Sequence, residues 1–156
     1  MVKTMKLAEA LMERKDIKGR MEALKKRLHA SAKAEEGHPP AEAPSELLGS
    51  LANEILAFEQ IVARINLTNA ATRFPDGESL VLALIRKDML RYRHLVLTNL
   101  ADHAVSTGPR YSARELRTVP TIDVVATRRR ADDAAREGRI LDARIQRMNW
   151  ETQLAE

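Results

Sequence analysis

The stretch LGSLANEILAFEQIVARINLTN, residues 48–69, decides the fold of this chain. Its apolar side chains recur at alternating steps of three and four residues, a heptad pattern typical of long helices that pack as coiled coils. The seam consists of Leu48, Leu51, Ile55, Phe58, Val62, Ile65 and Asn69. The last position, Asn69, carries an amide, so a polar side chain interrupts the apolar seam at this end of the predicted helix.

Helical periodicity continues on both sides of this stretch, and proline and glycine residues separate the segments. The sequence predicts long helices over about 4–33, 45–73, 79–107 and 121–154 in a single domain spanning 1–156. One irregular connection lies between the third and fourth helices. Helices joined in this order most simply form an antiparallel up-down four-helix bundle. We therefore expect an all-α fold.

Composition excludes several classes of protein. The chain has no cysteine, which excludes disulfides and thiolate chemistry. It contains neither a run of 18 uncharged apolar residues nor an apolar signal region near the start, so we expect no transmembrane segment and a cytoplasmic location. The net charge of +4 comes from 26 cations intermixed with 22 anions, which argues against tight nucleic-acid binding.

No familiar catalytic or metal-binding pattern is present. The sequence has no recognisable nucleophile–base pair, phosphate loop or dinucleotide fingerprint, so we expect neither a cofactor nor a set of catalytic residues. His94 and His103 lack partners at ligand spacing, and His38 lies three residues after Glu35 in a glycine- and proline-containing loop. We therefore expect no metal site.

Two of the predicted helices have features that favour self-association. The segment 79–107 is apolar on more than one side, so it is either the most buried helix of the bundle or a contact with another copy. The segment 121–154 has small residues along the first half of its seam, which permit close approach of a neighbour. A lone bundle would leave part of this surface exposed, so we expect a homo-oligomer.

An up-down bundle brings the polar interruptions of several seams to one end. The candidate ligand-binding residues there are Arg14, Asn66, Asn69, Arg73, Asp88, Arg91, Asn149 and Trp150. Each has a structural alternative. Arg14 either packs its stem while its guanidinium reaches solvent or binds an anion. Asn69 either fixes the register of the helices or binds a ligand.

Several short motifs carry a resemblance to a known family. They are MKLAEAL (5–11), INLTN with AATR (65–73), RYS (110–112), TIDV (121–124) and IQRMNW (145–150). Together they resemble an uncharacterised bacterial family often labelled septicolysin-like. The resemblance implies a helical bacterial protein of unestablished biochemical role.

Three hypotheses about function follow. The first is a non-enzymatic cytoplasmic helical bundle that self-associates as a structural or interaction protein. The second is a bundle that binds, and in one variant transforms, a small polar or anionic ligand at its polar end. The third is a pore-forming cytolysin, which the family label suggests.

Overall fold

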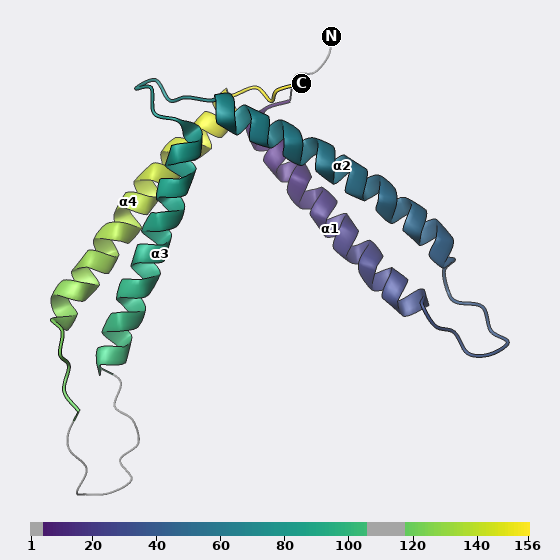
Figure 1. Cartoon of the computed structure of the whole chain (residues 1–156), viewed down its shortest axis with the longest axis horizontal. Helices are drawn as coiled ribbons and strands as arrows, with labels where there is room; N and C mark the ends of the chain where they lie inside the picture. Colours follow the sequence, from purple (N-terminus) through teal and green to yellow (C-terminus); the bar gives the residue numbers. More distant parts are fainter. Residues whose placement is uncertain (1–4, 106–117) are drawn as a thin grey trace, which may run out of the picture. The chain divides into compact units, whose positions relative to one another are not determined.

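The computed structural model describes residues 5–105 and 118–156, and the described chain is entirely helical apart from turns and connections (Figure 1). Its helices are α1 (Leu7–Ser31), α2 (Pro44–Ala71), α3 (Leu80–Val105) and α4 (Val124–Glu151). Consecutive helices pair in antiparallel fashion, α1 with α2 and α3 with α4. The predicted all-α class is confirmed. Most of the predicted irregular connection between α3 and α4 lies outside the described residues.

The helix ends differ from the predicted ones by up to three residues, for local reasons. Helix α2 begins at Pro44, one residue early, because proline is tolerated in the first turn, where no intrahelical N–H bond is lost. Helix α4 begins only at Val124, because Asp123 caps it: the Ala126 N–H donates to Asp123 Oδ1 at 2.9 Å. Helix α1 begins at Leu7 behind a capping contact in which the Lys6 N–H donates to Glu9 Oε2 at 2.7 Å.

The chain divides into two compact units. Unit 1 comprises residues 1–74 and 147–156, and unit 2 comprises residues 75–146. The core of unit 1 lies between α1 and α2. Its buried apolar side chains are Leu7, Ala8, Ala10, Ile17, Leu24, Leu47, Ile61, Ile65, Phe74 and Leu154.

The seam predicted for α2 is only partly correct. Leu48 and Ile55 are 56% and 47% exposed, whereas Leu47 and Ile61 are buried. Helix α2 is apolar on two adjacent stripes, and the contact with α1 uses the stripe that contains Leu47, Ile61, Ile65 and Thr68. Heptad spacing shows that a helix has an apolar side, but it does not decide which of two neighbouring stripes meets the partner.

Unit 2 is built on close contact between α3 and α4. The seam predicted for α4 consists of Thr127, Ala131, Ala134, Gly138, Leu141, Ile145 and Met148. It is largely confirmed, because all are buried except Gly138 and Met148, which are half-buried. On α3, the side chains that contribute to the core are Leu80, Ala83, Leu90 and Ala101, which are all buried. The other apolar side chains of α3, such as Leu82, Ile85 and Met89, are exposed. The predicted alternative in which α3 is the most buried helix is therefore wrong.

In unit 1, the two end segments of the described chain are tied to α2. Residues 5–7 and 152–154 pair in antiparallel fashion: the Leu7 N–H donates to the Thr152 carbonyl at 3.0 Å, and the Leu154 N–H donates to the Met5 carbonyl at 2.9 Å. The Ala155 N–H donates to Thr68 Oγ1 at 2.9 Å, and Arg64 Nε donates to the Ala155 carbonyl at 2.8 Å. We call residues 5–7 and 152–155, with Arg64 and Thr68, the terminal clasp.

In unit 2, the turn before α3 is held against α4. Gly77 has φ +87°, a left-handed conformation that glycine adopts without strain. The guanidinium of Arg144 on α4 donates to Glu78 Oε2 at 2.7 Å and to Asp76 Oδ2 at 2.6 Å. This fork fixes the start of α3 relative to α4. No helix in the described part of the chain combines the length and apolar character needed to cross a membrane.

Candidate functional site

The eight predicted site residues do not fall within one unit. Six of them belong to unit 1 and two, Asp88 and Arg91, belong to unit 2. In unit 1, Arg14, Asn66 and Arg73 are exposed and Asn69 is half-buried. Asn149 is buried at 5% exposure, while its neighbour Trp150 is 54% exposed. The ligand site expected from these residues remains a prediction.

Polar groups next to the predicted residues are occupied by structural hydrogen bonds. Thr68 Oγ1 donates to the Arg64 carbonyl at 2.7 Å while accepting the Ala155 N–H. Thr72 Oγ1 donates to the Thr68 carbonyl at 2.7 Å, and Lys6 Nζ donates to the Glu151 carbonyl at 3.1 Å. These contacts support the interpretation in which the polar end caps the helices and fixes their register.

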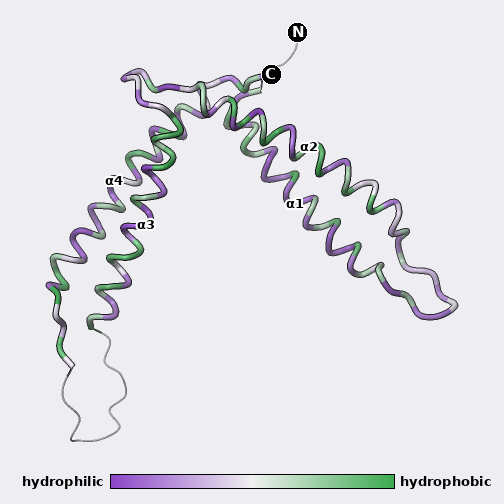
Figure 2. Tube along the Cα trace, viewed as in Figure 1, coloured by the Kyte–Doolittle hydropathy of each residue, from purple (hydrophilic) through white to green (hydrophobic). Residues whose placement is uncertain are grey.

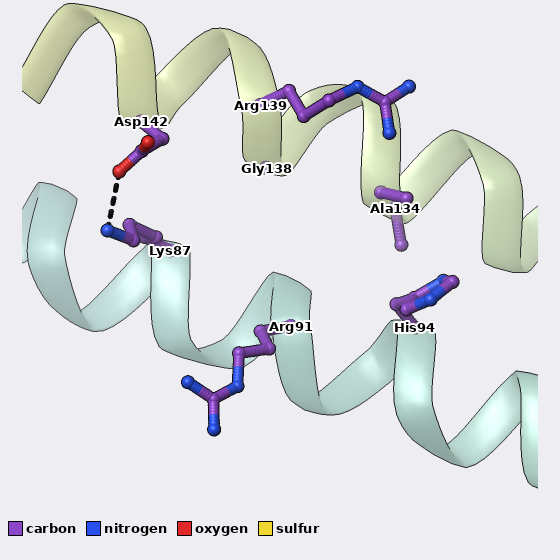
Figure 3. Close-up of a pocket in the computed structure, with 8 residues that line it drawn as sticks. Lys87, Arg91, His94, Ala134, Gly138, Arg139 and Asp142 are labelled. Carbon is purple, nitrogen blue, oxygen red and sulfur yellow. Dashed lines mark hydrogen bonds and ion pairs between the residues drawn. The ribbon is translucent and has the colours of Figure 1, made fainter.

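Unit 2 contains a groove between α3 and α4 that takes in one predicted residue, Arg91 (Figure 3). Its volume is about 270 Å³. It is lined by Lys87, Arg91, His94, Ala134, Ala135, Gly138, Arg139 and Asp142. Helix α3 contributes the first three of these residues and α4 the other five. Small side chains from α4 form the floor, and long cationic side chains stand at the edges.

One ion pair closes an end of this groove. Lys87 Nζ donates to Asp142 Oδ1 at 2.5 Å across the two helices. The ammonium group holds the pKa of the Asp142 carboxyl below its usual value, and Gln146 adds a weaker hydrogen bond in the same direction. Asp142 is therefore ionised at neutral pH and its charge is matched by Lys87.

The two arginines of the groove, Arg91 and Arg139, are not paired in this way. Among the described residues, neither Arg91 nor Arg139 forms an ion pair. In Figure 3 the Arg91 guanidinium extends away from α4, and that of Arg139 runs along α4. His94 Nδ1 lies 3.0 Å from the Ala131 carbonyl oxygen, which can only accept, so Nδ1 carries the proton. In the neutral ring, Nε2 is then the acceptor.

The floor of the groove contains a glycine in the middle of a helix. A Cβ added to Gly138 would lie 3.9 Å from Leu90 Cβ, an ordinary van der Waals distance. Contact between α3 and α4 therefore leaves room for alanine at this position. Glycine in a helix interior costs about 1 kcal/mol relative to alanine, and its φ lies outside the left-handed region. The packing of unit 2 does not account for that cost.

Four polar groove residues were not predicted from the sequence: Lys87, His94, Arg139 and Asp142. For His94 the sequence indicated only that no partner lies at metal-ligand spacing. The available signal was the run of small residues on α4, which indicated close contact but not which residues of α3 lie opposite. Among the described residues, no group of three His, Cys, Asp or Glu side chains is arranged to hold a metal ion.

Comparison with known proteins gives this fold a family. A model of a family of unknown function, DUF6847, matches residues 14–154, which is most of the chain. This chain belongs to DUF6847. The septicolysin-like assignment made from the short motifs is therefore wrong, because the family whose model matches the chain is DUF6847. The cytolysin hypothesis depended on that assignment and loses its basis.

A crystal structure similar to this DUF6847 protein is described as that of a functionally unknown conserved protein from Corynebacterium diphtheriae. The two chains are 41% identical, with a TM-score of 0.89 over 97% of this chain and 99% of the other. No curated protein matches this chain. The comparisons thus establish the family and the fold.

Proposed function

We propose that this protein is a non-enzymatic structural or interaction protein that self-associates, with the exposed stripe of α3 as one side of the contact. The observation that carries the proposal is a row of large apolar side chains on α3 that its contact with α4 leaves exposed. The stripe consists of Leu82, Ile85, Met89, Tyr92, Val96 and Leu100, which are 43–63% exposed. Figure 2 shows hydrophobic positions recurring along α3.

The geometry of this stripe fits an extended helix partner. Its positions follow one another at steps of three or four residues, so they lie on one side of α3. From residue 82 to residue 100 the stripe is roughly 27 Å long at about 1.5 Å per residue. Monomeric proteins rarely expose a contiguous apolar surface of this extent, and one that does usually has a binding role.

Helix α2 offers the complementary surface. It exposes four large apolar side chains that the contact with α1 leaves free, Leu48, Ile55, Leu56 and Leu67, and Leu48 and Ile55 share one stripe. Helix α2 carries three glutamates and one arginine, whereas α3 carries four arginine and lysine residues and two aspartates. The acidic helix and the basic helix each present an apolar stripe, so their charges favour pairing α2 of one copy with α3 of another.

A twofold axis can close this pairing. In a dimer with a twofold axis, α2 of the first copy contacts α3 of the second, and the reverse contact follows by symmetry. Both exposed stripes of both copies are then buried, which leaves none to recruit a third chain. We therefore infer a dimer as the associating unit.

Light scattering coupled to size exclusion tests the proposal. The wild type should elute with twice the 17.5 kDa mass of one chain at micromolar concentration. Met89→Glu and Ile55→Glu should each give monomers, because each buries a charge in the apolar contact of α3 or α2. The matched control is Ile140→Glu on α4, which is 67% exposed and belongs to neither stripe. It should stay dimeric.

The outcomes separate the possible arrangements. A monomeric wild type at about 100 μM, far above the dissociation constants of stable homodimers, would refute self-association. Loss of the dimer in Met89→Glu with retention in Ile55→Glu would refute the α2–α3 pairing and indicate contact between two α3 helices. Equal loss in all three variants, including Ile140→Glu, would show that no particular stripe carries the contact.

A further inference from the structure

The groove between α3 and α4 combines features that the packing of unit 2 does not explain. Gly138 leaves open a floor that alanine could fill, since its added Cβ would meet Leu90 at an unstrained 3.9 Å. The groove also has two edge arginines, Arg91 and Arg139, that have no acidic partner among the described residues. Its one carboxylate, Asp142, is already matched by Lys87. The remaining charge of the groove is positive.

We propose that this groove binds a small organic anion with an apolar body. The oxyanion group, a carboxylate or a phosphate, meets the guanidinium groups of Arg91 and Arg139, which swing from the edges toward the opening. The apolar body lies over Ala134, Ala135 and Gly138. Arginine suits this role because its planar fork donates two parallel hydrogen bonds to an oxyanion. His94 Nε2 is available as an acceptor for a ligand hydroxyl.

The size of the groove limits the ligand. A volume of about 270 Å³ equals that of roughly nine water molecules at about 30 Å³ each. A ligand with on the order of ten non-hydrogen atoms fills it, such as an eight-carbon chain with one carboxylate. Longer acyl chains extend beyond it onto the surface of α3 and α4. An open groove of this size, lined by apolar atoms at the base and cations at the edges, suits a weakly held metabolite more than a tightly bound cofactor.

Nitrogen–proton correlation spectra of the whole protein titrated with octanoate test the proposal, with octyl phosphate, inorganic phosphate and octanol in parallel. Octanoate should shift the amide resonances of residues 134–142 and 87–94 saturably, with a dissociation constant on the order of 1–10 mM or tighter. Octyl phosphate should act at the same residues, and its affinity relative to octanoate tells which oxyanion is preferred. Octanol and inorganic phosphate should each bind at least about tenfold more weakly, because each lacks one half of the recognised chemistry.

Variants identify the groups responsible. Arg91→Gln and Arg139→Gln should each weaken octanoate binding about tenfold, the usual effect of losing a charge-assisted hydrogen bond. Gly138→Ala should weaken it at least about fivefold by filling the floor. Two changes serve as controls. Arg130→Gln removes an exposed cation of α4 outside the groove, and Gly19→Ala fills a helical glycine of α1 with nothing within 4 Å. Both should leave binding unchanged.

Three results would each overturn the proposal. The first is the absence of saturable shifts in the groove, or shifts confined to the α3 stripe. The second is octanol binding as tightly as octanoate, which would mean that the cations do not recognise the ligand. The third is an equal loss of affinity in Arg130→Gln and Arg91→Gln, which would mean that only general charge attracts the anion. Gly138→Ala and Gly19→Ala both gain helix propensity. A loss of binding in Gly138→Ala alone therefore cannot come from unfolding.

Discussion

Replacing Thr68 with valine should destabilise the protein through the terminal clasp. Thr68 is 4% exposed, and its hydroxyl has two hydrogen bonds: it donates to the Arg64 carbonyl at 2.7 Å and accepts the Ala155 N–H at 2.9 Å. Valine keeps the β-branched shape and nearly the same helix propensity. The change therefore removes the hydroxyl and leaves the Ala155 N–H without its acceptor.

The expected magnitude follows from the two bonds. The bond to Arg64 is a local one to the carbonyl four residues back, which contributes little. The bond from Ala155 joins residues 87 positions apart in a part-buried setting, and leaving such a donor unsatisfied costs about 1–2 kcal/mol. In a chain of 156 residues, that loss lowers Tm by about 3–6 °C. The amide of Ala155 should also lose its protection from hydrogen exchange.

Thr127→Val provides a matched control for this experiment. Thr127 is also a buried helical threonine, at 9% exposure, and its hydroxyl donates to the Asp123 carbonyl at 2.7 Å. That carbonyl also accepts the Thr127 N–H at 3.0 Å, so valine leaves no group of the helix unpaired. Urea unfolding followed by circular dichroism should show the larger loss for Thr68→Val. Equal losses, with Ala155 exchange unchanged, would refute the argument.

Two further predictions concern pH and cooperativity. Lys87 is the main cause that lowers the pKa of Asp142, and the Glu78 N–H, with Arg144, lowers the pKa of Asp76. A carboxylate whose pKa is lower in the folded state than in the unfolded state stabilises the fold at pH values above its unfolded-state pKa. That stability is lost as the pH falls through its folded-state pKa. The stability difference between the wild type and Asp142→Asn should therefore shrink as the pH falls below 3.8, and a constant difference would contradict it. We also propose that the chain unfolds as a single domain, because α4 runs without a break across the boundary after residue 146; two resolved calorimetric transitions would show otherwise.

The class of the fold could be predicted from the sequence because helix periodicity and helix breakers are local signals. The order and number of helices followed from them, and so did the buried seam of α4, whose small residues leave one side available for close contact. The seam of α2 did not follow, because two adjacent stripes satisfy the same spacing. Which one is buried depends on α1, whose own buried side chains include Leu7, Ile17 and Leu24.

The candidate site was harder to predict, for a related reason. Polar residues at the end of a helix have the same pattern whether they cap helices or bind ligands. Thr68 and Lys6 turned out to hold backbone groups of the chain's last residues. The groove in unit 2 depends on Gly138 lying opposite Leu90. That register between α3 and α4 is set by tertiary packing, and the spacing of residues within either helix does not encode it.

The terminal clasp also sets an order of events during synthesis. Helices α1 and α2 are complete once residue 74 is made, but unit 1 also needs residues 147–156. At about 5–20 residues per second, the intervening chain takes roughly 4–14 s to be translated. During that time the Leu7 N–H and Thr68 Oγ1 lack the partners that they have in the finished fold. Unit 1 is therefore completed only after residues 147–156 have been made, and a nascent chain stalled before residue 152 presents the unpaired ends of α1 and α2 to the chaperones around it.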